Sequence, residues 1–172
     1  MSFLPIFILG LIQGITEFLP ISSSGHIFVA GKFLNFKQQS LLIDVSLHLG
    51  TLAAVIVYFK RESKILLLNS LSIFQNKSDE HALFTKHIIT ATVPIVIIGG
   101  VIFLFGIADI LRNIQVIALA TIFFGILLYF ADLKSNNEIH IKDLTTQKSF
   151  LIGIFQILSI IPGTSRSGIV YT

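Results

Sequence analysis

The sequence predicts an all-α integral membrane protein that crosses the bilayer several times and contains two broken, re-entrant helices from an inverted-type repeat. Of its 172 residues, 53% are apolar and only 12% are charged, about half the charged fraction of a soluble domain. The apolar residues form runs long enough to span a membrane, and two further runs stop at segments rich in Pro, Ser and Gly. This composition excludes a soluble enzyme and a disordered tail, and the lack of cysteine excludes a disulfide scaffold.

Three uninterrupted runs predict membrane-spanning helices: residues 41–59, 88–105 and 114–131. Residues 65–74 form a shorter apolar piece that we expect at the membrane interface, and residues 27–34 are too short to cross alone. The predicted polar connections are residues 60–64, 75–86 and 132–148.

Two other apolar runs break off. Residues 3–19 lead into residues 20–26 (PISSSGH), and residues 150–161 lead into residues 162–168 (PGTSRSG). Each run contains a Gln, then a Pro six or seven residues later, then a hydroxyl-rich loop. Broken helices at corresponding places in two repeats indicate a binding site near the midplane. We therefore predict one membrane domain, 1–172, with a first repeat over 1–105 and the start of a second over 106–172.

Lys and Arg predict the orientation, because cytoplasmic loops carry more of them. Eight lie at one end of the predicted bundle: Lys60, Arg61, Lys64, Lys77, Lys86, Lys134, Lys142 and Lys148. Three lie at the other: Lys32, Lys37 and Arg112. The first end is therefore predicted to be cytoplasmic, and both Pro-Ser-Gly loops are expected at extracytoplasmic helix ends. The basic residues form no stripe, so we expect no nucleic-acid partner. The first residues lack the basic flank of a signal peptide, and the N-terminus is taken as mature.

The first loop carries an acid, hydroxyls and an imidazole. Gln13 and Glu17 are four residues apart and share a helix face. A carboxylate inside a membrane costs about 2.5–3.5 kcal/mol and needs a cation, a metal or a proton. Ser22, Ser23 and Ser24 then offer hydroxyls and backbone N–H groups to an anion. His26 is expected to accept a proton from one of these hydroxyls, which is an arrangement for covalent catalysis.

The second loop adds a fixed positive charge. Arg166 lies between Ser165 and Ser167, and a guanidinium binds phosphate oxygens in pairs while staying charged. Together the two loops predict hydrolysis of a phosphate ester or anhydride, in which Arg and a metal ion steady the phosphate while a hydroxyl or water attacks.

Residues 13–26 (QGITEFLPISSSGH) and 162–168 (PGTSRSG) resemble the two signatures of the bacterial undecaprenyl-pyrophosphate phosphatases, the BacA-type bacitracin-resistance family. Residues 44–51 (DVSLHLGT) and 91–94 (ATVP) are also similar to stretches of that family. The resemblance runs from about residue 5 to the last residue. It implies a hydrolase of the bacterial inner membrane, active on the extracytoplasmic side, that removes the terminal phosphate of a C55 polyprenyl diphosphate. The carrier lipid is thereby recycled for peptidoglycan synthesis, and bacitracin resistance follows.

The same resemblance implies a role for each matching residue. The catalytic residues would be Glu17, Ser23, His26 and Arg166. The substrate-binding residues would be Gln13, Ser22, Ser24, Ser165 and Ser167. Gln13 and Glu17 would also bind a divalent cation, Mg²⁺ or Ca²⁺, and the family allows a homodimer. Whether Ser23 attacks as nucleophile, or His26 or Glu17 activates water, stays open from the motifs.

Two departures from the family pattern matter. Val170 stands where the second signature usually has Thr. Family members are also substantially longer, and this chain stops inside its second broken unit. We therefore expect a fragment that folds poorly or needs the missing helices to work.

Two rival functions remain from the sequence. Ser24-Gly25-His26 and Ser165-Arg166 also occur in another class of lipid phosphatase, but that class needs a His where Thr172 stands. Broken helices are also typical of transporters, so a carrier or flippase for a polyprenyl phosphate is the second rival.

Several polar residues are given weaker predictions. Asp44 and His48 are as compatible with a buried structural pair as with a site role. The remaining histidines, His81, His87 and His140, are expected to be solvated. Asp109 and Arg112 are expected only to end two spans.

Overall fold

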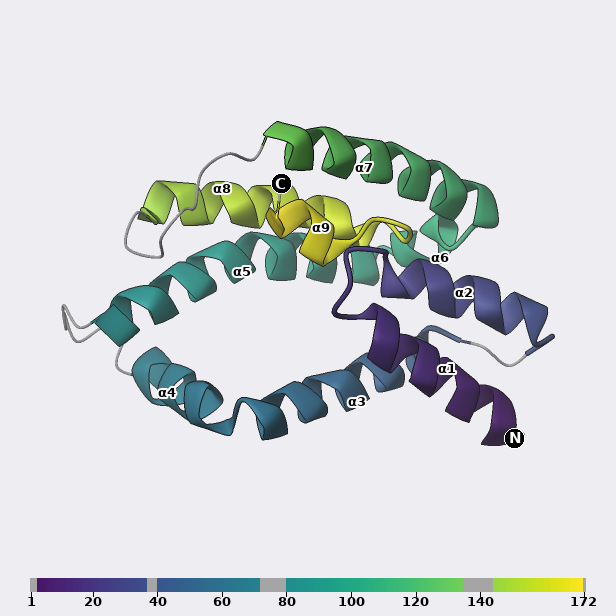
Figure 1. The fold of residues 1–172 in the computed structure, drawn as a ribbon, viewed down its shortest axis with the longest axis horizontal. Coiled ribbons are helices and arrows are strands. Elements are labelled where there is room, and N and C mark those ends of the chain that lie inside the picture. The colour runs from purple at the N-terminus through teal and green to yellow at the C-terminus, as the bar shows by residue number, and fades with distance from the viewer. Residues whose placement is uncertain (1–2, 37–39, 72–79, 135–143, 172) are drawn as a thin grey trace.

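The computed structural model describes residues 3–36, 40–71, 80–134 and 144–171, and all its regular elements are helices. The first half contains α1 (Phe3–Thr16), α2 (Ser23–Phe33), α3 (Leu41–Tyr58), α4 (Lys60–Leu71) and α5 (Glu80–Leu104). The second half contains α6 (Ile107–Leu111), α7 (Ile114–Lys134), α8 (Thr146–Gln156), the 3₁₀ turn η2 (Ile157–Ile160) and α9 (Arg166–Tyr171). Figure 1 shows the helices lying along one long axis, as expected for a membrane bundle.

Three helices, α3, α5 and α7, are long and apolar enough to cross a membrane. They confirm the three predicted spans. Large apolar side chains on α7, including Leu119 and Phe123, are more than half exposed. Such a surface is unfavourable in water but suits the hydrocarbon of a bilayer, where lipid tails are as apolar as leucine. The chain is therefore an all-α membrane protein.

Three boundaries differ from the prediction. Residues 60–64, expected as a polar connection, form the start of α4, because their long side chains are good helix formers despite their charge. Helix α5 begins at Glu80, inside the predicted connection 75–86, and α7 continues to Lys134. Charged residues thus extend the helices beyond their apolar cores. Residues 72–79 and 135–143, with His140, lie outside the described residues.

Helices α5 and α8 make the most extensive interhelical contact. A Cβ placed on Gly153 would lie 2.6 Å from the carbonyl oxygen of Ala91 and 2.9 Å from Cγ of Pro94. Only glycine therefore lets the two backbones approach this closely, as small residues do in membrane helix packing.

A buried polar pair lies in the same α5–α8 contact. Ser149 is fully buried, its Oγ lies 2.9 Å from Nδ1 of His87, and it donates to the carbonyl oxygen of Thr145. The prediction that His87 is solvated is wrong, because burial in a helix contact gives it a hydrogen-bond partner in place of water. His81, by contrast, is exposed as expected.

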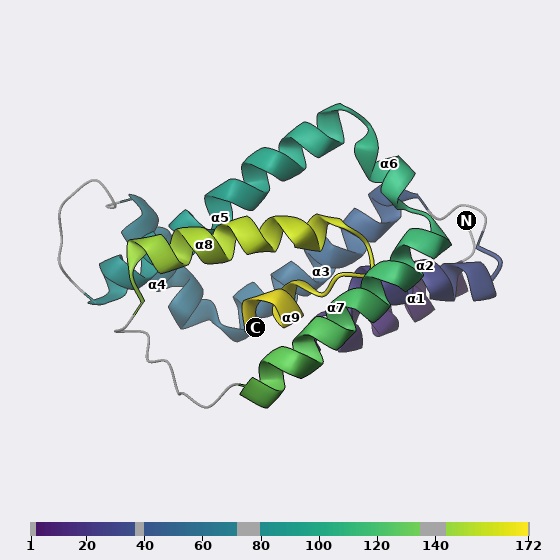
Figure 2. The ribbon, with the colours of Figure 1, turned by 90° about the horizontal axis from the view of Figure 1, so that it is seen from above.

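Both broken helices reverse direction inside the molecule (Figures 1 and 2). Helix α1 enters from the end that holds the N-terminus, and α2 returns to that end. Helix α8 enters from the opposite end, and α9 turns back after it. The loops were expected at extracytoplasmic helix ends. In the structure both loops lie between the two ends of the molecule, and the side of the membrane that they face stays a prediction.

The two loops contact each other. Ser167 Oγ donates to the carbonyl oxygen of Leu19 at 3.2 Å, and a Cβ on Gly25 would lie 3.6 Å from Cα of Gly163. Gly163 itself has φ +98°, and a Cβ there would lie 2.5 Å from the carbonyl oxygen of Ile117. Glycine is required at this position, since a side chain would collide with α7 and strain the backbone. The Pro-Gly break thus lets the second loop dock onto α7 and the first loop.

Candidate active site

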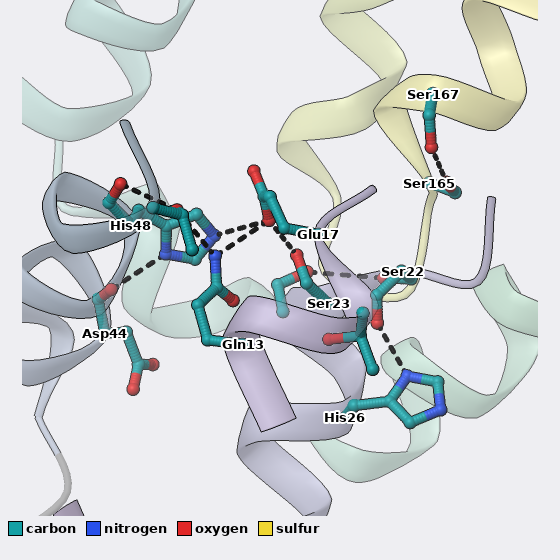
Figure 3. A network of polar contacts seen from close by, with 12 residues as sticks. Gln13, Glu17, Ser22, Ser23, His26, Asp44, His48, Ser165 and Ser167 are labelled. Atoms are coloured by element: carbon teal, nitrogen blue, oxygen red, sulfur yellow. Dashed lines mark hydrogen bonds and ion pairs between the residues drawn. The ribbon is translucent and has the colours of Figure 1, made fainter. Parts of the chain in front are cut away.

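Glu17 is the centre of a polar cluster just beyond the end of α1 (Figure 3). Its Oε2 accepts hydrogen bonds from Gln13 Nε2 at 2.8 Å and from Ser23 Oγ at 2.5 Å. Nε2 of His48 lies 3.7 Å from the same oxygen. One carboxylate oxygen is therefore approached by side chains from α1, α2 and α3.

The local backbone explains how these groups meet. The Glu17 amide still donates to the Gln13 carbonyl at 3.0 Å, so the two side chains keep the i, i+4 relation of a helix. The chain then turns around Pro20, and α2 starts at Ser23 with its side chain toward α1. Gln13 is only 1% exposed, and its Nε2 also approaches Thr51 Oγ1 on α3 at 3.3 Å. Gln13 therefore ties α1 to α3.

Ser22 holds the turn in an uncommon conformation. Its φ is 61°, in the left-handed region that serine rarely adopts, and its side chain is buried. Its Oγ lies 3.3 Å from that of Ser24. Non-glycine residues in this region cost about 1–3 kcal/mol and cluster at functional sites.

His26 points away from Glu17 and Ser23 (Figure 3). Its Nδ1 donates to the carbonyl oxygen of Ser22 at 2.9 Å. Among the described residues, no hydrogen bond joins its ring to a serine hydroxyl. The structure thus pairs Ser23 with Glu17, not with His26, and the catalytic role of His26 stays a prediction.

Arg166 and Glu17 line the same cavity of about 580 Å³, together with His48 and Thr51 of α3. Ser165 and Ser167, which flank the arginine, lie with their Oγ atoms 3.0 Å apart. A basic residue from the second loop and an acidic residue from the first therefore line the same cavity. These are the charges expected for a site that binds an anion and activates a hydroxyl.

A second, larger cavity of about 770 Å³ lies between the loops and helices α7, α8 and α9. His26 and Ser165 line it, while most of its other lining residues are apolar. Four predicted site residues are therefore divided between two cavities: Glu17 and Arg166 line the smaller one, and His26 and Ser165 line the larger one. Ser165 and Arg166, adjacent in sequence, open onto different ones.

Two α3 residues beside Glu17, His48 and Thr51, were not among the predicted site residues. His48 Nδ1 donates to the carbonyl oxygen of Asp44 at 2.8 Å, and Thr51 Oγ1 donates to that of His48 at 2.9 Å. The spacing of polar residues over 44–51 was the available signal, since it places His48 and Thr51 within one turn of a helix.

The Asp44 carboxylate pairs with Arg112, whereas the sequence suggested a pair with His48. Its Oδ2 accepts a hydrogen bond from Arg112 at 2.6 Å, and both side chains are about five-sixths buried. Arg112 was expected only to end a span. Instead it joins the start of α3 to the turn before α7. The Asp109 side chain lies outside the described part of the structure.

Gln13 and Glu17 fit a divalent cation in one respect. The Gln13 Oε1 atom is buried without a hydrogen-bond partner, and Nε2 of the same amide donates to the Glu17 carboxylate. Within the described ranges no three His, Cys, Asp or Glu side chains gather. These residues therefore suit an ion such as Mg²⁺, which binds through one or two protein ligands and keeps waters or substrate phosphates as the others.

Comparison with known proteins identifies the family. Residues 6–172 match the family described as "Bacitracin resistance protein BacA". The chain belongs to the BacA family. Curated relatives of this BacA-family chain include "Undecaprenyl-diphosphatase" of Jannaschia sp. (strain CCS1), 41% identical over 100% of the chain. The proteins of the same name from Saccharophagus degradans and Roseobacter denitrificans are 43% and 40% identical, over 95% and 100% of the chain.

The BacA-family chain spans slightly less than two thirds of these relatives. The match covers 65% of the Jannaschia protein, 62% of the Saccharophagus protein and 65% of the Roseobacter protein. Glu17 and Arg166, which share one cavity, both lie inside the region that matches the family.

Proposed function

We propose that the protein is a membrane hydrolase that removes the terminal phosphate from undecaprenyl diphosphate. The observation that carries this proposal is the cavity shared by Glu17 and Arg166, which come from opposite ends of the chain. A guanidinium matches the oxygens of a diphosphate, and a carboxylate is the base that a hydroxyl needs. The names of the relatives, "Undecaprenyl-diphosphatase", support the substrate.

In this proposal Arg166 binds the diphosphate, and the hydroxyls of Ser22, Ser24, Ser165 and Ser167 and the Gln13 amide bind its remaining oxygens. The polyprenyl tail lies between the helices. Both loops offer backbone N–H groups as well, since each precedes the start of a helix. The interior position of the loops favours strong electrostatic binding, because the low dielectric weakens charge pairs less than water does.

Ser23 is the proposed nucleophile. Its hydroxyl already donates to Glu17, so Glu17 accepts the proton as Oγ attacks the terminal phosphorus. The bond from that phosphorus to the bridging oxygen breaks, and polyprenyl monophosphate leaves with the bond's electron pair. Water then attacks the phosphorus of the phosphoserine, and the Oγ–P bond breaks. Glu17 returns its proton to Ser23 Oγ, and the released inorganic phosphate carries the oxygen and the protons of the water.

The proposed cofactor is a divalent cation, Mg²⁺ or Ca²⁺, held by Glu17 and Gln13. When bound, it would neutralise charge on the phosphate oxygens. We further propose an inner-membrane location, an extracytoplasmic opening of the site and a role in recycling the peptidoglycan carrier lipid, with bacitracin resistance as the result. A homodimer is compatible with this arrangement.

Phosphate release from a polyprenyl diphosphate by detergent-solubilised protein tests the proposal. Removing one charged group from such a site lowers the rate about 100-fold or more, so Glu17→Gln and Arg166→Ala are expected to lose activity to that extent. Glu62→Gln and Arg61→Ala are matched controls, because these exposed residues lie on α4 at the other end of α3. Turnover within threefold of wild type in either site variant would contradict the proposal.

The transporter rival rests on the broken helices that enter from opposite ends, which is also transporter architecture. Detergent-solubilised protein does not separate two compartments, and a carrier breaks no bond. A carrier would therefore release no phosphate in this assay. Transfer of labelled lipid phosphate across a vesicle membrane, without bond cleavage, would favour the carrier instead.

A further inference from the structure

We propose that His48 is a metal ligand, and that its Nε2 and the Glu17 carboxylate together bind one divalent cation. The inference rests on the proposed function only in placing a cation at Glu17. His48 belongs to neither loop signature. Its candidacy comes from its position on α3, where Nε2 lies 3.7 Å from Glu17 Oε2.

The hydrogen bond on the other ring nitrogen fixes the tautomer. A carbonyl oxygen only accepts hydrogen bonds, so Nδ1 of His48 carries the hydrogen that bonds to Asp44. A neutral His48 then presents the lone pair of Nε2 to the Glu17 oxygen. Two acceptors facing each other repel, and a cation bound by both removes that repulsion.

The distance fits a shared ion. Two neighbouring ligands that each lie about 2.1 Å from an octahedral ion such as Mg²⁺ are about 3.0 Å apart, so the observed 3.7 Å lets both side chains bind one ion after a small movement. Both side chains open onto the cavity that Arg166 also lines. An ion there would have room for waters or phosphate oxygens as further ligands.

The surroundings of His48 are those of a metal ligand. Metal-binding histidines almost always donate their second ring N–H to a carbonyl or carboxylate, which fixes the ring orientation. His48 makes this bond to Asp44, whose carboxylate is in turn held by Arg112 at 2.6 Å. The backbone that orients the ring is therefore anchored to a different part of the chain.

His26 is a natural comparison. Its Nδ1 also donates to the carbonyl four residues earlier, at 2.9 Å. However, His26 lines the larger, mainly apolar cavity and points away from Glu17. The two histidines share the same local bond, but only His48 faces a carboxylate.

Mn²⁺ is the probe for the test, because it accepts both oxygen and imidazole ligands and is paramagnetic. Mn²⁺ is added to the purified protein without substrate, and pulsed electron paramagnetic resonance detects nitrogen bound to the ion. We expect a ¹⁴N signal that changes to ¹⁵N when histidine alone is ¹⁵N-labelled. We also expect His48→Gln to remove the signal and weaken Mn²⁺ binding about tenfold or more. In His26→Gln the signal is expected to persist.

The labelled wild-type protein shows whether any histidine binds the ion even if His48→Gln misfolds, and His26→Gln then tests the other histidine near Ser22. Three results would each overturn the inference: no bound Mn²⁺, no histidine nitrogen at the ion, or a nitrogen signal that is lost in His26→Gln or persists in His48→Gln. Because no substrate is present, the result is separate from phosphate release. A protein that binds Mn²⁺ through His48 but hydrolyses nothing would refute the proposed function and leave this inference standing.

Discussion

At the scale of single residues, the site is defined by what surrounds one carboxylate oxygen. Gln13 and Ser23 donate to Glu17 Oε2, and His48 approaches it from α3. Intramembrane carboxylates need such partners, because an unpaired charge in hydrocarbon is costly. The hydrogen bonds from Gln13 and Ser23 therefore give the Glu17 carboxyl group polar partners and place a hydroxyl directly beside it.

Ser23→Ala is expected to lower phosphate release about 100-fold or more, since the proposed nucleophile is lost. Ser46→Ala is a matched control, because Ser46 is an exposed serine on α3 whose hydroxyl donates to the Leu42 carbonyl oxygen of its own helix. The measurements are initial rates for both variants, and mass spectrometry for phosphoserine at position 23 after rapid quenching. Full activity in Ser23→Ala would show that water attacks directly.

The Asp44–Arg112 pair gives a second prediction at this scale. Its two side chains are 16% and 17% exposed. The burial of this ion pair is therefore intermediate between that of surface ion pairs, which contribute under about 1 kcal/mol, and that of buried ion pairs, which cost about 3–5 kcal/mol to break. Arg112→Met is therefore expected to destabilise the protein by about 1–3 kcal/mol. Thermal unfolding in detergent measures this change.

A double-mutant cycle with Asp44→Asn provides the control for that prediction. The coupling energy should account for most of the loss if the ion pair is responsible. Additive effects of the two substitutions would show that each side chain acts through other contacts.

At the scale of elements, glycines decide how closely helices approach. Gly153→Ala is expected to destabilise the α5–α8 contact by about 1–3 kcal/mol, because the new Cβ would lie 2.6 Å from the Ala91 carbonyl oxygen. Gly100→Ala on α5 is the matched control, since a Cβ there meets nothing within 4 Å and alanine is the better helix former. Thermal unfolding of both variants tests the comparison, and equal stability would contradict the packing argument.

The elements also show what a hydropathy pattern can predict. The three spans were predicted to within a few residues at their apolar cores, because about 20 apolar residues are what a bilayer requires. The charged ends of these helices were not predicted. Residues 60–64 and 80–86 are helical although their charges indicated connections, since Lys, Arg and Glu favour helix wherever the backbone continues.

At the scale of the whole molecule, the arrangement predicts which residues face which side. Lys32 lies near the end of α2 and Arg61 near the start of α4, and both are exposed. The sequence has no cysteine, so single substitutions report cleanly. Lys32→Cys is expected to react with a membrane-impermeant maleimide in intact spheroplasts, and Arg61→Cys only after lysis. The opposite pattern would reverse the proposed orientation.

The sequence by itself determined the class of protein, the spans, the two broken helices and the residues of the loop signatures. These follow from composition, from run length and from local motifs. Only the tertiary structure decided that the broken helices enter from opposite ends. It alone also paired Ser23 with Glu17, brought His48 beside them and buried His87 against Ser149. The physical reason is that apolar side chains suit lipid and protein neighbours equally. The pattern of a membrane helix therefore shows that it is buried in the bilayer, but not which helix it meets there.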